Sequence, residues 1–266
     1  MELFIPILIF GLGASIGSFI SVLVYRIHSN KKGIIAGRSI CPNCKKELSA
    51  TDLIPIFSYV INGGKCRHCK KQISYHYLLL ELSGGMIFLT IFLNFYFFNT
   101  DNFNIDWPML LKFIFHLIYG SFLLAIFIYD LKYKEIPDVF LFPFIVIALL
   151  GTICTGSLNI FEILIAVVIV LFLFGGQILI SKGKWLGEGD LYLSIAMALF
   201  LGWQKLLIAI IVSYIIGAIV SIILIIRKNA KMETAIAFAP FLVLGTFFAI
   251  FFGDFFIQSY LGLLNL

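Results

Sequence analysis

The sequence predicts an all-α polytopic membrane protein with about eight transmembrane helices and a small cytoplasmic zinc-ribbon-like insertion. The first observation is composition: 61% of the residues are hydrophobic and only 12% are charged, whereas soluble domains are about 25% charged. The second is that the apolar residues gather into runs, several of them about 20 residues long, which is the length that crosses a bilayer as a helix. The third is two Cys-x-x-Cys pairs inside the one long polar block.

The apolar runs define the predicted helices in order. A cleavable signal peptide would carry basic residues before its apolar core, but Glu2 precedes the first run and Arg26 follows it. We therefore expect a retained first helix. The predicted spans are residues 3–25, 77–98, 108–129, 139–153, 160–180, 191–201, 206–226 and 234–252. They divide the chain into a first helix (1–25), a zinc-binding domain (26–76) and a transmembrane core (77–266).

The distribution of basic residues predicts the orientation of these helices. Of the 19 Lys and Arg residues, 17 lie in four polar loops (26–75, 131–137, 181–189 and 227–233), and only Lys112 and Lys205 lie elsewhere. Cytoplasmic loops of membrane proteins carry such an excess of Lys and Arg. We therefore expect these loops in the cytoplasm, the N-terminus outside and the loop 99–107 outside. The net charge of +5 reflects this topology, and no nucleic-acid partner is predicted.

Four of the five cysteines lie in the block 26–76 and predict a metal site. Cys41 and Cys44 form one pair and Cys66 and Cys69 the other, each followed by Lys-Lys, one variable residue, an aliphatic residue and Ser. Two thiolate knuckles at this spacing are typical of four-cysteine zinc sites. A structural zinc ion would also explain how a block with few large apolar residues folds. The alternative is a pair of redox-active Cys-x-x-Cys motifs.

Two further stretches near the start have structural interpretations. Gly11, Gly13 and Gly17 form a stripe of small residues in the first helix, which predicts a helix-packing face; a catalytic role is the alternative. The segment 52–60 between the cysteine pairs is apolar but too short to span a membrane. We expect it to form a helix or loop that lies on the membrane or packs on the zinc site.

Two aspartates at membrane boundaries are the candidate catalytic residues. Asp130 follows the third apolar run and Asp190 precedes the sixth, and both fall at the cytoplasmic boundary in the predicted topology. Carboxylates at such positions are costly unless they have a function. Two aspartates whose carboxyl groups lie close together in space can catalyse hydrolysis of a peptide bond. One acts as general base on a water molecule, and the other donates a proton to the carbonyl oxygen. A proton relay in a transporter is the alternative.

Residues beside these aspartates are further candidates for the site. We expect Gly187 and Gly189 to let the backbone bend and to admit an extended peptide next to Asp190. Glu188, together with Glu135, is predicted to attract basic residues of a substrate; ordinary solvated loop charge is the alternative.

Two other carboxylates have competing interpretations. Asp138 follows Pro137 and is either a helix-start residue stabilised by the free N–H groups there or part of the site. Glu81 lies in the first turns of the second span, where it either reaches back to the interface or contributes to substrate binding or the site. Cys154, the fifth cysteine, is expected to be an apolar filler of a helix.

These motifs resemble a known family. Gly187-Glu188-Gly189-Asp190 is similar to the signature of GxGD-type aspartic membrane proteases. The wider pattern resembles bacterial type IV prepilin peptidases, the leader peptidase/N-methyltransferase family. This resemblance also includes Gly17-Ser18-Phe19, both cysteine pairs, Asp52-Leu53-Ile54-Pro55, Ile136-Pro137-Asp138 and Ala239-Pro240-Phe241-Leu242.

The resemblance implies an activity and its partners. The substrates would be prepilins or pseudopilins in the lipid bilayer of the bacterial inner membrane, cut after the glycine that ends a short basic leader, on the cytoplasmic face. Asp130 and Asp190 map onto the catalytic pair. Many relatives then methylate the new N-terminus with S-adenosylmethionine. The rival hypotheses are a proton-coupled transporter with a zinc-binding regulatory loop and a non-catalytic scaffold for pilus assembly.

Overall fold

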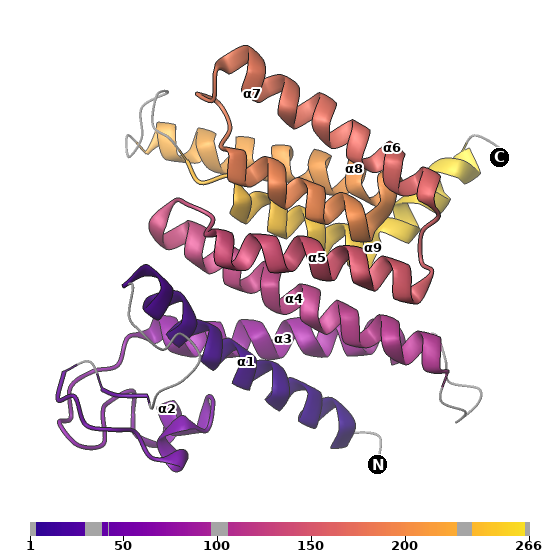
Figure 1. Cartoon of the computed structure of the whole chain (residues 1–266). Coiled ribbons are helices and arrows are strands. Elements are labelled where there is room, and N and C mark those ends of the chain that lie inside the picture. The colour runs from indigo at the N-terminus through magenta and orange to yellow at the C-terminus, as the bar shows by residue number, and fades with distance from the viewer. Residues whose placement is uncertain (1–3, 30–38, 42, 97–105, 228–235, 264–266) are drawn as a thin grey trace. The chain divides into compact units, whose positions relative to one another are not determined.

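The computed structural model describes residues 4–29, 39–41, 43–96, 106–227 and 236–263, and every named element in them is helical (Figure 1). The chain forms two compact units, residues 1–125 and 126–266. The predicted outside loop 99–107 and the basic residues Lys228 and Lys231 lie largely or wholly outside the described residues.

Two closely packed helices form the frame of the first unit. α1 (Phe4–His28) runs antiparallel to α3 (Tyr75–Tyr96). A β-carbon on Gly13 would collide with the backbone of Gly84, and one on Gly17 with the backbone of Leu80. The predicted packing face therefore exists at Gly13 and Gly17, whereas Gly11 has no neighbouring atom within 4 Å of such a β-carbon. Small residues allow this close approach of helices in lipid.

The polar block between α1 and α3 carries two short helices. These are the 3-10 turn η1 (Ala50–Leu53) and α2 (Phe57–Ile61), separated by Ile54, Pro55 and Ile56. The apolar side chains of Phe57, Val60 and Ile61 are 65–79% exposed. Such an exposed patch needs an apolar partner, and that this partner is the membrane stays a prediction, whereas Tyr59 of the same helix packs on Gly64 beside the second knuckle.

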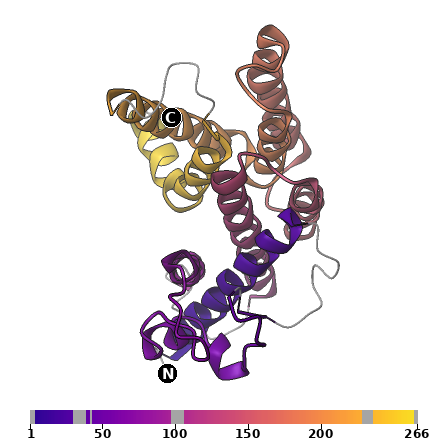
Figure 2. The same ribbon diagram turned by 90° about the vertical axis from the view of Figure 1, so that its left-hand side faces the viewer.

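The second unit is a bundle of long apolar helices. It contains α5 (Asp138–Thr155), α6 (Ile160–Val170), α7 (Gly176–Ser181), α8 (Glu188–Ile226) and α9 (Ala239–Leu263). A single π-helical turn, η2 (Leu171–Gly175), joins α6 to α7. α8 is the central element, since α5, α6 and α9 all pack against it, and Figure 2 shows α8 and α9 side by side.

Two of the eight predicted spans lie within one named helix, α8. Seven helices in the described residues are long and apolar enough to cross a membrane, because the predicted spans 191–201 and 206–226 are both part of α8. α8 is 39 residues long and breaks at Gly202, whose φ of 72° and ψ of 172° are not helical. The parts before and after the break run in opposite directions in Figure 1. The reversal at Gly202 lies where the sequence predicted a turn, so the two predicted spans are present as two antiparallel parts of α8.

Two helix boundaries also differ from the prediction. α4 (Trp107–Tyr133) continues past residue 129, so Asp130 lies within its last turn rather than after its end. α9 begins at Ala239 and continues to Leu263, five residues later at its start than the predicted span 234–252. Pro240 fits its second position, because the first N–H groups of a helix need no partner within the helix.

Candidate metal centre and active site

The two cysteine pairs of the first unit form matching knuckles. In the first, the Cys41 N–H donates to the Lys46 carbonyl and the Lys45 N–H to the Cys41 carbonyl, both at 2.9 Å. The second repeats both bonds at 2.9 Å, between Cys66 and the backbone of Lys70 and Lys71. The corresponding lysines, Lys45 and Lys70, both have positive φ (56° and 58°). The repeated sequence pattern therefore folds twice into the same turn.

The four cysteine sulfurs are placed to share one metal ion. The Sγ atoms of Cys41, Cys44, Cys66 and Cys69 all lie within 4.8 Å of one another. Tetrahedral zinc with Zn–S bonds of about 2.3 Å would place the sulfurs about 3.8 Å apart. The cluster therefore fits a four-coordinate metal with small adjustments, and the site can hold a zinc ion.

The backbone around Cys66 favours its thiolate. N–H groups of Cys69 and then His68 donate to the sulfur and lower the pKa of Cys66 to about 7. Hydrogen bonds that stabilise the charged form act in this direction, and the thiolate is the form that binds metal. The fifth cysteine, Cys154, lies in α5, is exposed, and is not part of the cluster.

Glu81 is a buried carboxylate that holds the segment between the knuckles. Its side chain is 9% exposed, and Oε2 accepts a hydrogen bond of 2.7 Å from the Ile56 N–H. Ile56 has φ of 65° and ψ of −54°, and the Phe57 N–H bonds to the Pro55 carbonyl at 2.6 Å across it. This γ-turn is strained for a β-branched residue. Glu81 therefore fixes a strained turn, a role that neither of its two sequence interpretations included.

Asp130 is a buried carboxylate of the second unit. It lies in the last turn of α4 and is 4% exposed. The Ala239 N–H, at the start of α9, donates a hydrogen bond to it, whereas the Oδ2 atom is buried and has no hydrogen-bond partner among the described residues. A buried carboxylate oxygen without a partner is costly. Such an atom is poised to hold a proton or to accept one from a bound water.

Asp190 lies in the first turn of α8 and is half-buried. Its Oδ2 accepts a hydrogen bond of 3.3 Å from the Gly187 N–H, which caps the helix start. Asp130 is one of the charges that act on Asp190. The structure therefore brings the two predicted aspartates, 60 positions apart in the sequence, within electrostatic range of each other.

The loop between α4 and α5 contacts the residue that precedes each of the two aspartates. The Tyr129 hydroxyl donates to Glu135 Oε1 at 3.2 Å, which anchors the loop next to Asp130. A β-carbon on Gly189 would lie 3.2 Å from Cβ and Cδ1 of Ile136, so the same loop packs against the residue before Asp190.

The unusual backbone bend expected at the two glycines is absent, whereas admission of a peptide beside Asp190 stays a prediction. Neither Gly187 nor Gly189 has a positive φ, so no unusual backbone bend is needed at either position. Gly189 matters because it has no side chain to press on Ile136, and a β-carbon on Gly187 would meet nothing closer than 3.6 Å.

The remaining predicted site residues occupy exposed positions. Glu188 is the first residue of α8 and Asp138 the first of α5, and both are exposed. A shallow hollow of about 470 Å³, whose lining includes Leu179, Lys182 and Leu186, lies beside Gly187 and Glu188. Asp138 has the position that its helix-start interpretation predicts.

Several residues of these sites were not selected as site residues, although Ile136 and Ala239 lie in motifs that carry the family resemblance. Ala239 contributes only its backbone N–H to Asp130, and Ile136 contributes an apolar contact with Gly189. Ile56 contributes the backbone turn that Glu81 holds. None carries a chemical group that sequence reasoning searches for. Only Tyr129, a polar side chain directly before Asp130, could have been selected from the sequence.

Comparison with known families matches both units. The family described as "Bacterial Peptidase A24 N-terminal domain" matches residues 11–95, and the "Type IV leader peptidase family" matches residues 117–222. The second range contains both aspartates and the first contains all four cysteines of the metal centre. The chain belongs to the type IV leader peptidase family.

Curated type IV leader peptidases are similar over nearly the whole chain. A "Prepilin leader peptidase/N-methyltransferase" of Pseudomonas aeruginosa is 28% identical over 94% of this chain and 91% of its own length. Proteins of the same name from Aeromonas hydrophila (96% and 93%) and Legionella pneumophila (93% and 91%) are each 26% identical. No solved structure matches this chain significantly.

Proposed function

We propose that this protein removes the leader from type IV prepilins or pseudopilins at the cytoplasmic face of the bacterial inner membrane. The observation that carries the proposal concerns Asp130. One of its carboxylate oxygens is buried and has no hydrogen-bond partner in the part of the chain that the structure describes, and its charge acts on Asp190. Relatives named prepilin leader peptidase match both units. The orientation, with the N-terminus outside, rests on the distribution of Lys and Arg.

Asp130 and Asp190 act as a general acid–base pair in the proposed mechanism. One aspartate is ionised and takes a proton from water, and the resulting hydroxide attacks the carbonyl carbon of the leader glycine. The other aspartate is protonated and donates its proton to the carbonyl oxygen. The C–N bond then breaks as the leaving amine takes up a proton. Close carboxylates share one proton because two adjacent negative charges repel each other.

The exposed start of α8 is the proposed approach for the substrate. The hollow beside Gly187 and Glu188 is lined mainly by apolar residues, and Glu188 adds a negative charge where a basic leader would pass. We assign the four-cysteine centre to zinc, which would hold the knuckles together without taking part in cleavage. Methylation of the new N-terminus with S-adenosylmethionine is proposed from the names of the relatives.

Mass spectrometry of a prepilin tests this function. The purified full-length protein is mixed with a prepilin that carries its leader, with and without S-adenosylmethionine. We expect loss of the leader mass in both samples, and a further gain of one methyl group only with the donor. An intact leader across prepilins, pseudopilins and competence pilins from one bacterium would contradict the proposal. Cleavage with no gain of a methyl group would leave the peptidase and remove the methyltransferase.

A further inference from the structure

Tyr129 is a buried tyrosine beside the proposed catalytic pair. It directly precedes Asp130 in the last turns of α4, and only 3% of it is exposed. The centroid of its ring is 4.8 Å from that of Tyr133 and 6.1 Å from that of Phe140, the second in an edge contact. Phe140 belongs to α5. These ring contacts hold the tyrosine in place and fix the direction in which its hydroxyl points.

The Tyr129 hydroxyl reaches a carboxylate of the loop between α4 and α5, residues 134–137. It donates a hydrogen bond of 3.2 Å to Oε1 of Glu135, whose residue is itself exposed. Buried hydroxyl groups need such a partner, and hydrogen bonds to a charged acceptor are stronger than those between neutral groups. One side chain of α4 therefore ties down the loop that follows the helix.

The backbone of the same loop is held at a second point. Lys134 has φ of 58°, a left-handed conformation that residues with a side chain adopt only where their surroundings hold them in it. Its N–H donates to the Asp130 carbonyl at 2.8 Å. The loop therefore has two hydrogen bonds to the last turns of α4, the helix that carries Asp130.

The other end of the loop contacts the segment that carries Asp190. Ile136 follows Glu135 directly and lies against Gly189. Gly189 is the residue before Asp190. A series of contacts therefore runs from the Tyr129 hydroxyl through Glu135 and Ile136 to the start of α8. Loss of the first contact would free the loop to move, and the start of α8 would lose a fixed neighbour.

We propose that Tyr129 and Glu135 form a positioning pair for the two aspartates. Their hydrogen bond holds the loop between α4 and α5 against the start of α8, and this contact sets where Asp190 lies relative to Asp130. The inference rests on the proposed function, because the pair serves the reaction of these aspartates. It gives Glu135 a role other than attraction of a basic leader, which stays the proposed role of Glu188.

The kinetics of leader cleavage test the pair. The full-length protein in detergent is assayed on a purified prepilin, and kcat and KM are measured separately. Tyr129→Phe removes only the hydroxyl and keeps the ring, and Glu135→Ala removes the acceptor. Because a displacement of catalytic groups by about 1 Å can cost about 100-fold in rate, we expect kcat to fall about tenfold in both variants. We expect little change in KM, because neither variant removes a contact with the substrate.

Glu135→Gln separates positioning from attraction by charge. Glutamine keeps an oxygen that can accept the hydrogen bond from Tyr129, but it has no negative charge. We expect Glu135→Gln to keep most of the wild-type kcat on every leader. If Glu135 instead attracted the leader, Glu135→Gln would behave as Glu135→Ala does, and KM would rise most for leaders with several lysines. That result would overturn the proposal.

A double variant shows whether the two side chains act together. Both single substitutions break the same hydrogen bond, so the variant that combines Tyr129→Phe with Glu135→Ala should cut no more slowly than either alone. A loss equal to the product of the two single losses would contradict the pair.

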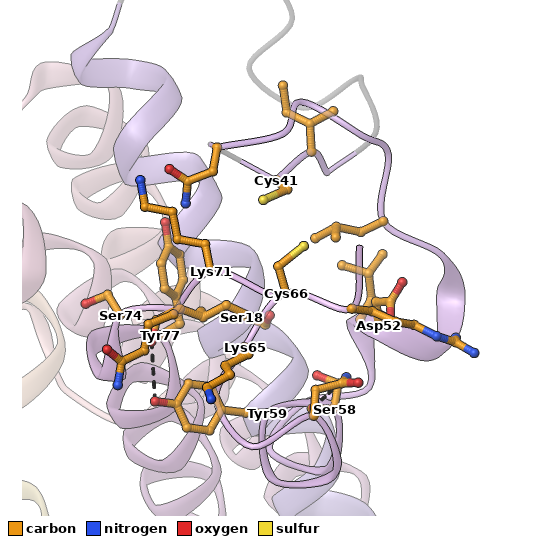
Figure 3. Close-up of a pocket in the computed structure, with 18 of the residues that line it drawn as sticks. Ser18, Cys41, Asp52, Ser58, Tyr59, Lys65, Cys66, Lys71, Ser74 and Tyr77 are labelled. Atoms are coloured by element: carbon orange, nitrogen blue, oxygen red, sulfur yellow. Dashed lines mark hydrogen bonds between the residues drawn. The ribbon is translucent and has the colours of Figure 1, made fainter. Parts of the chain in front are cut away.

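Tyr59→Phe is the matched control for loss of a tyrosine hydroxyl. The Tyr59 hydroxyl donates to the Ile73 carbonyl at 3.4 Å and lines a pocket beside the cysteine knuckles (Figure 3). Tyr59 belongs to the first unit, which contains neither Asp130 nor Asp190. We expect Tyr59→Phe to cleave the prepilin with the kcat of the wild type, and a fall equal to that of Tyr129→Phe would contradict the assignment.

Hydrogen exchange without substrate separates this inference from the proposed peptidase. We expect amides of residues 134–137 and 187–190 to exchange about tenfold faster or more in Tyr129→Phe and Glu135→Ala, but not in Glu135→Gln. Unchanged exchange in both segments, or a Tyr129→Phe variant that cuts as the wild type does, would overturn the pair and leave the peptidase. The expected exchange in a protein that cuts no prepilin would support the pair and contradict the peptidase.

Discussion

Ile136 lies against Gly189, so that a β-carbon on residue 189 would be 3.2 Å from both Cβ and Cδ1 of Ile136. Ile136 belongs to the loop that follows Asp130, and Gly189 directly precedes Asp190. The contact therefore joins the two chain segments that carry the aspartates. A glycine at this position sets how closely the start of α8 can approach the loop.

Alanine substitutions at the two glycines should have different effects. Gly189→Ala requires Ile136 or the start of α8 to give by a few tenths of an ångström, and because a displacement of about 1 Å can cost about 100-fold in rate, a smaller one beside Asp190 is also costly. We expect leader cleavage to fall at least tenfold in Gly189→Ala and to change little in Gly187→Ala, whose β-carbon has space. The measurement is kcat/KM on a purified prepilin.

A compensating substitution tests the cause of that loss. Ile136→Ala removes Cγ1 and Cδ1, which a β-carbon at 189 would press upon, so the double variant should recover part of the lost activity. Activity of the double variant no higher than that of Gly189→Ala alone would show that the Ile136 contact is not the cause.

Removal of zinc should loosen the first unit. We expect one zinc ion per chain in the native protein, and none in Cys66→Ser. Because structural zinc contributes folding free energy directly, a chelator should make the segment 40–74 sensitive to proteases. Cys154→Ser is the matched control, since Cys154 is exposed and distant in sequence from the cluster. Zinc loss in that variant would contradict the assignment of the ligands.

Glu81 should protect the Ile56 amide from hydrogen exchange. Loss of a bond to a charged acceptor costs about 1.5–3 kcal/mol, which corresponds to local opening about ten- to 150-fold more often. We expect the peptide containing Ile56 to exchange faster by this factor in Glu81→Ala, and less so in Glu81→Gln, which keeps an acceptor oxygen. A peptide around Asn159 serves as internal control. Unchanged exchange at Ile56 would mean that Glu81 does not hold the turn.

Charge reversal at Glu188 should depend on the leader. Glu188 is exposed at the start of α8, and exposed charge pairs contribute about 0.2–1 kcal/mol each. We expect Glu188→Lys to reduce kcat/KM more for leaders with several lysines than for leaders with one, and the difference to shrink at high salt. An equal reduction across the series would rule out attraction of the leader by this residue.

The parts of the fold that the sequence predicted are those with a repeated or periodic signal. The knuckles follow from a duplicated pattern, and the spans follow from apolar runs of sufficient length. The reversal at Gly202 falls between two predicted spans, whereas the continuation of α4 past Asp130 and the later start of α9 have no such signal. Hydropathy does not report where a helix continues past an apolar run or begins within one, which is why those two boundaries differed.

The site was predictable only where its chemistry resides in polar side chains. Two carboxylates at membrane boundaries and two thiolate pairs are unusual enough to be selected by residue type alone. The contact of Ile136 with Gly189 and the Ala239 N–H that bonds to Asp130 involve apolar residues or backbone. Glu81 could be selected as a candidate, but its partner Ile56 lies 25 residues away and has no pattern that predicts the turn.

The most direct test of the account is cleavage of one prepilin by Asp130→Asn, Asp190→Asn and Asp138→Asn, followed by mass spectrometry. Loss of a general acid or base lowers the rate by about 10²- to 10⁴-fold, so we expect an intact leader with either of the first two variants. Asp138→Asn, exposed at a helix start, should cut as the wild type does. Leader removal that survives both substitutions at Asp130 and Asp190 would contradict the aspartate mechanism.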